Sequence, residues 1–77
     1  MTTTDQVRVK ALTLAEADAP TAEAVRELMD CCGGKRVPVV LARQAFQMHL
    51  EETEHADPVV DRAADLLDQL LAKMPLD

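Results

Sequence analysis

Residues 57–74, DPVVDRAADLLDQLLAKM, decide the fold class, because their apolar residues recur with helical spacing. Asp57 followed by Pro58 is typical of an N-cap residue and the first residue of a helix. Intervals of three and four residues form one continuous apolar stripe, which consists of Val60, Ala63, Ala64, Leu67, Leu70, Leu71 and Met74. The pattern therefore predicts a helix over residues 57–74, which Pro75 ends.

Two further helices are predicted upstream of this segment. Residues 20–32 carry an apolar stripe and precede Gly33–Gly34, where glycine readily adopts the left-handed conformation of a helix C-cap. Residues 38–54 begin with a proline and are apolar over much of the helix circumference, so we expect this helix to be the central one. The β-branched residues of 36–42 leave a second strand open as an alternative there.

The segment 6–12 shows a different periodicity, with apolar and basic residues in alternation. Val7, Val9 and Ala11 would lie on one side of an extended chain, and Arg8 and Lys10 on the other. A period of two predicts a short strand or an extended arm.

The expected fold class is therefore mainly α, a small three-helix domain with a short N-terminal extended arm or strand. Residues 1–5 are expected to form a flexible N-terminal tail, and residues 6–77 a single small domain. The apolar stripes predict a core that includes Val25, Leu28, Cys32, Ala42, Phe46, Leu50, Ala63, Leu67 and Leu70.

Composition excludes several classes of protein. The 77 residues are 48% hydrophobic, which argues against disorder, and their formal net charge of −6 disfavours nucleic acid and anionic membranes as partners. Phe46 is the only aromatic residue, which argues against base-stacking modules. No apolar run is long enough for a membrane span, and no apolar stretch like that of a signal peptide occurs, so we expect a cytoplasmic location.

Chemistry-bearing residues are few. Glu52 and His55 are three residues apart and could share a metal ion on one helix face, with His49 nearby, but such a pair more often lies on a solvated acidic helix end. The adjacent Cys31 and Cys32 have no zinc-site spacing. The chain contains no serine and no nucleophile motif, so we expect no enzyme activity and no cofactor.

The favoured function is a small acidic, non-enzymatic protein-interaction or regulatory module, acting as a helical homodimer or as an accessory subunit. The stripe of residues 57–74 is wider than one short helix can cover, so a second copy of the chain is the expected partner. The residues expected at this interface are Leu66, Leu67, Leu70, Leu71 and Met74.

Two alternatives belong to other functional classes. The order of strand, helix, glycine turn and helix over residues 6–54 resembles that of ribbon–helix–helix DNA-binding dimers, such as repressors and antitoxins. That resemblance implies paired strands that place Arg8 and Lys10 in the major groove. The linker LTLAEADAP is long for that fold. The second alternative is a metal-binding helical protein that uses His49, Glu52 and His55.

Overall fold

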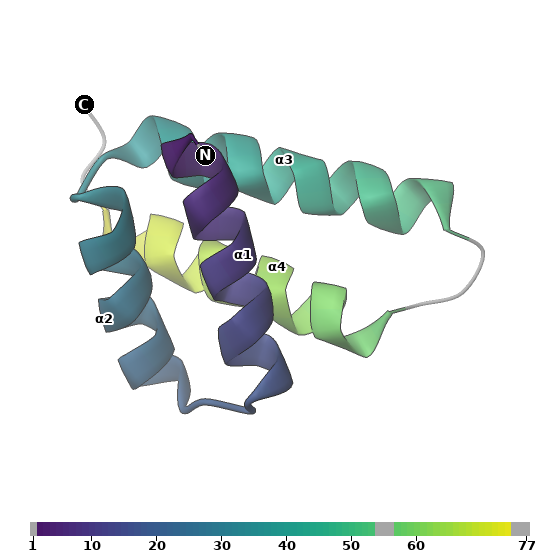
Figure 1. Cartoon of the computed structure of the whole chain (residues 1–77), viewed down its shortest axis with the longest axis horizontal. Helices are drawn as coiled ribbons and strands as arrows, with labels where there is room; N and C mark the ends of the chain where they lie inside the picture. The colour runs from purple at the N-terminus through teal and green to yellow at the C-terminus, as the bar shows by residue number, and fades with distance from the viewer. Residues whose placement is uncertain (1, 54–56, 75–77) are drawn as a thin grey trace.

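The computed structural model describes residues 2–53 and 57–74, and these form four α-helices (Figure 1). The helices are α1 (Thr3–Glu16), α2 (Thr21–Cys32), α3 (Arg36–Glu52) and α4 (Pro58–Lys73). The hairpin of α1 and α2 lies across the hairpin of α3 and α4. The two described ranges contain no strand. The domain is therefore an all-α four-helix fold, and the expected three-helix fold with an extended arm is wrong.

The expected strand over residues 6–12 lies inside α1. Val7 and Ala11 are completely buried and Leu14 is almost so, which is the spacing of four and three residues that a helix requires. Val9 is 44% exposed, although a strand would place it on the same face as Val7. Over residues 6–12, Val7 and Ala11 fit both the period of a strand and that of a helix. The apolar stripe that continues to Leu14 fits the helix.

α1 begins at Thr3, inside the segment that the sequence predicts as a flexible tail. Thr2 is the N-cap residue, and its hydroxyl oxygen accepts a hydrogen bond of 3.1 Å from the backbone N–H of Asp5. Residues 3–5, which we expected in the tail, thus form the first turn of α1.

The other three helices match the expected segments to within two residues. At the end of α2, Gly33 adopts φ = 63°, and the N–H of Gly34 donates to the carbonyl of Met29 at 3.2 Å. At the start of α4, the Asp57 carboxylate accepts from the N–H groups of Val59 and Val60 at 3.0 and 3.4 Å, as the sequence predicted.

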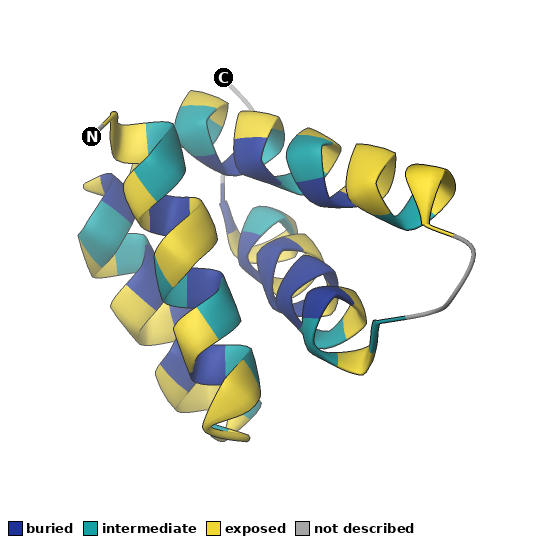
Figure 2. Ribbon diagram, turned by 45° about the vertical axis from the view of Figure 1, so that its right-hand side comes forward, coloured by how far each residue is buried: buried dark blue, intermediate teal, exposed yellow. Residues whose placement is uncertain are grey.

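The central helix is α4, whereas the sequence indicated α3. Leu66, Leu67 and Leu70 of α4 are completely buried, and α4 has more buried residues than any of the other three helices (Figure 2). The expected core is confirmed except at Leu50, which is only partly buried. The core also contains residues that the sequence analysis did not place there, namely Val7, Ala11, Leu14, Ala24, Val39, Val60, Ala64, Leu66 and Met74.

Candidate functional site

The surface expected to bind a second copy is the core of a single chain. Leu66, Leu67 and Leu70 have no exposed surface, Met74 is 6% exposed, and Leu71 is partly buried against the core. In the single chain these residues therefore belong to the core and do not form an exposed surface. These residues are buried because α1 is a fourth helix, which covers the apolar width of α4 that a three-helix domain would leave exposed.

Exposed apolar side chains instead gather on the outer face of α3. Val37 is 67% exposed, Leu41 47% and Met48 58%, so each shows about half or more of its surface to solvent. Their spacings of four and seven residues place all three within about 40° of one another around the helix. We call Val37, Leu41 and Met48 the α3 stripe.

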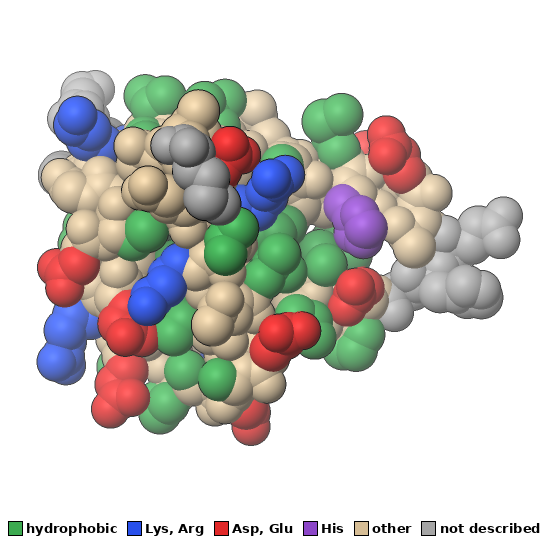
Figure 3. Space-filling model, viewed as in Figure 1, with side chains coloured by type: hydrophobic (Ala, Val, Ile, Leu, Met, Phe, Trp, Pro, Cys, Tyr) green, Lys and Arg blue, Asp and Glu red, His purple; other side chains and the backbone are tan. Residues whose placement is uncertain are grey.

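The α3 stripe lies opposite the face by which α3 packs on the rest of the domain. Val39, Ala42 and Phe46 are buried on the inner face. Among the helices of residues 2–53 and 57–74, none lies beyond the outer edge of α3 in Figure 1, and Figure 3 shows hydrophobic side chains along that edge of the molecule. Eleven residues separate the ends of the stripe, which corresponds to about 16 Å along the helix.

Charges of opposite sign lie at the two ends of α3. Lys35 and Arg36 stand at its N-terminal end, and Glu51 and Glu52 at its C-terminal end. Three of these four residues are exposed, and Arg36 is half-buried. A helix carries partial positive charge at its N-terminus and partial negative charge at its C-terminus. The side-chain charges therefore repeat the sign of the helix dipole at both ends, which destabilises an isolated helix.

Exposed polar side chains form hydrogen bonds along one flank of α3. The Arg43 guanidinium donates to the Asp68 carboxylate of α4 at 2.9 Å and to the Gln47 side chain at 3.1 Å. Gln47 in turn donates to Glu51 at 3.2 Å. The Arg43–Asp68 contact joins α3 to α4, and the other two hydrogen bonds lie within α3 along one flank of the helix.

A groove of about 530 Å³ lies between α1, the C-terminal half of α3 and the start of α4. Four of its lining residues are apolar and four carry polar groups; together they are Val9, Leu12, Thr13, Glu16, His49, Asp57, Val59 and Val60. The groove is shallow and open, and its polar groups come from three different segments.

The candidate metal ligands do not assemble within the described residues. His49 and Glu52 are both exposed, and His55 lies outside the described residues. Among residues 2–53 and 57–74, no three His, Cys, Asp or Glu side chains are placed to hold a metal ion. The metal-binding alternative gains no support from this arrangement.

The two cysteines have different surroundings at the end of α2. Cys32 is buried, and its thiol donates to the Met29 carbonyl at 3.3 Å. Cys31 is half-buried beside Lys10 and Asp30. These contacts are those of a packed helix end.

The basic residues proposed for DNA contact separate in the structure. Arg8 and Lys10 are two residues apart on a helix and thus point in directions about 160° apart. Arg8 contacts Asp5 at 3.3 Å, and Lys10 contacts Glu27 of α2 at 3.8 Å. Residues 6–12 are helical, so this segment does not form the strand that a ribbon–helix–helix dimer pairs across its two-fold axis.

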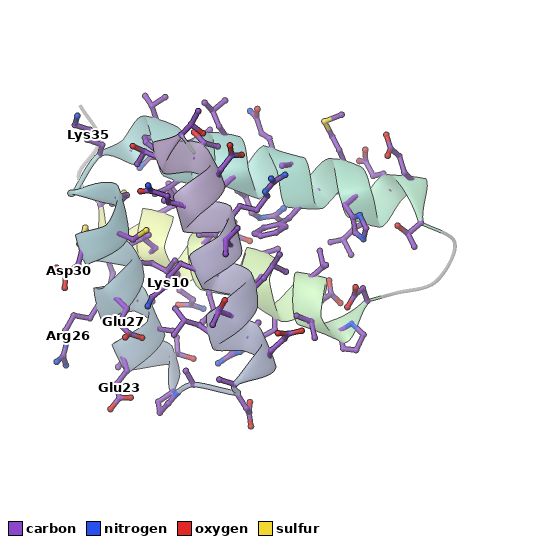
Figure 4. The ribbon with its side chains drawn as sticks, in the orientation of Figure 1. Lys10, Glu23, Arg26, Glu27, Asp30 and Lys35 are labelled. Atoms are coloured by element: carbon purple, nitrogen blue, oxygen red, sulfur yellow. The ribbon has the colours of Figure 1, made fainter. Side chains whose placement is uncertain are left out.

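The outer side of α2 carries mixed charge. Figure 4 shows Glu23, Arg26, Glu27 and Asp30 along this helix, with Lys10 of α1 beside them. Exposed carboxylates and guanidinium groups at such spacing are typical of a solvated helix face. The faces of α2 and α3 therefore differ, since only the latter presents large exposed apolar side chains.

In the part of the chain that the structure describes, no helix has the length and apolar character that a membrane crossing requires. Comparison of the chain with protein-family models, curated proteins and solved structures finds no match.

Proposed function

We propose that this chain is a small, non-enzymatic protein-interaction module, a regulator or accessory subunit, that binds its partner through the α3 stripe. The observation that carries the proposal is the exposure of Val37, Leu41 and Met48 on one helix face. Isolated exposed apolar residues are ordinary, but three large ones aligned on one helix face expose more apolar surface together than scattered residues do.

The shape of the surface also favours a protein partner. A rigid helix with apolar residues at helical spacing is one half of a helix–helix contact, in which the side chains of one helix fit between those of the other. Met48 adds an unbranched, adaptable side chain at one end of the stripe. The charges at the ends of α3 provide a polar border.

Site-specific photo-crosslinking tests this proposal in cells that naturally make the protein. A photoreactive amino acid replaces Leu41 in the α3 stripe or, in the matched control, Glu23 on the solvated face of α2. We expect defined covalent adducts from position 41 and few from position 23. Adducts of equal yield and diversity from both positions would contradict the proposal.

A further inference from the structure

We infer that the partner of the α3 stripe is a second copy of this chain, which pairs α3 with α3 in antiparallel orientation about a two-fold axis. This inference rests on the proposed function, because it names the partner for that surface. It also moves the expected homodimer from the buried seam of α4 to the exposed face of α3.

The distribution of charge on α3 selects the antiparallel arrangement. In an antiparallel pair, Lys35 and Arg36 of one copy lie near Glu51 and Glu52 of the other, and the same contact repeats at the opposite end. A parallel pair would instead bring like charges together at both ends. The sequence of α3 is thus complementary to itself in one orientation only.

The helix dipole gives a second reason. Alone, α3 holds basic residues at its positive end and acidic residues at its negative end, and both placements raise its free energy. In the antiparallel pair, acidic residues of the second copy approach the N-terminus of the first, and basic residues approach its C-terminus. Association therefore offsets a cost that the single chain carries.

The apolar residues fit the same symmetry. Gln44 lies at the middle of Arg36–Glu52 and is exposed on the side of the α3 stripe. With a two-fold axis near Gln44, Val37 and Leu41 of one copy lie near Met48 of the other. A single helix pair is smaller than a standard interface, so we expect a dissociation constant on the order of 10–100 µM.

The test is sedimentation velocity between about 5 and 500 µM, with two charge-reversed variants. One variant carries Glu51→Lys with Glu52→Lys, and the other carries Lys35→Glu with Arg36→Glu. Each variant brings like charges together at both ends of an antiparallel pair, so we expect each alone to dimerise at least about tenfold more weakly than the wild type. An equimolar mixture of the two variants should recover wild-type association, because opposite charges then meet at both ends.

Thermal unfolding of each variant alone shows whether a loss of association results from a loss of folding. Both reversals bring the side chains into agreement with the helix dipole, so each monomer should be at least as stable as the wild type. Loss of association without loss of stability is a combination that damaged folding cannot produce. The control is Glu23→Lys with Asp30→Lys on α2, which changes the net charge as much as the first variant and should leave association unchanged.

Three outcomes would overturn the inference: a wild type that stays monomeric at about 500 µM, reversed variants that dimerise like the wild type, or a mixture that does not recover association. A monomeric chain that still yields defined crosslinks from position 41 to another protein would overturn the inference and leave the proposed function standing. Absence of specific crosslinks from position 41 would overturn the proposed function itself.

Discussion

Asp18 is the residue with the most unusual backbone in this domain. It follows Ala17, the C-cap residue of α1, and adopts φ = 53°, which is the left-handed conformation that glycine usually provides. The N–H of Ala19 donates to the Leu14 carbonyl at 3.1 Å, and that of Asp18 to the Ala15 carbonyl at 3.2 Å. The hydrogen bonds are those that close α2 at Gly33 and Gly34, but an L-residue occupies the strained position.

Asp18→Gly should therefore stabilise the protein. Relief of the left-handed strain outweighs the added flexibility of the unfolded chain, and we expect a gain of about 0.5–1 kcal/mol in the free energy of unfolding. Urea denaturation measures this change. The matched control is Ala17→Gly one residue earlier, where φ is −77° and glycine should destabilise the protein. A loss of stability in Asp18→Gly would show that the Asp side chain contributes more than its backbone costs.

At the scale of single elements, α1 is the helix whose existence a paired substitution can test. Val7→Asp places a carboxylate at a completely buried position, and we expect a loss of at least about 3 kcal/mol or outright unfolding. Val9→Asp alters a side chain that is 44% exposed, and we expect a change of at most about 1 kcal/mol. Circular dichroism and thermal melting compare the two. A strand would place both residues on one face, so equal losses would contradict the helix.

The helices that the sequence predicted well are those with strong end signals. Asp57 with Pro58 marks the start of α4, and Gly33–Gly34 marks the end of α2. α1 lacks such a signal at its C-terminal end, where Asp18 takes the place of a glycine. Val7 and Ala11 also fit both periods within a seven-residue window, and only the inclusion of Leu14 separates a helix from a strand.

The error in α1 carried over into the candidate site. A strand at residues 6–12 would leave the apolar width of α4 without cover, and for this reason the sequence predicts Leu66 and Leu70 at an interface with a second copy. Val37 lies outside the predicted helix of residues 38–54. Leu41 and Met48 lie inside it and broaden its apolar face, although helical geometry separates them from Phe46 by most of a half-turn. The exposure of these side chains depends on which helices pack on α3, and the pattern of apolar residues in one sequence does not specify that packing.

At the scale of the whole molecule, the core closes within one chain, so folding and association are separate properties. The buried residues of all four helices form one cluster without help from a second copy.

Leu41→Lys should therefore abolish association but leave the melting temperature of the monomer nearly unchanged, since leucine and lysine both favour a helix and position 41 is 47% exposed. Phe46→Ala on the inner face of the same helix should cost about 3–5 kcal/mol, because Phe46 is 3% exposed and its loss leaves a cavity. Calorimetry at a few micromolar compares the two variants below the dissociation constant expected for the proposed dimer. If Leu41→Lys unfolds there as Phe46→Ala does, the α3 stripe is part of the core and not a surface for a partner.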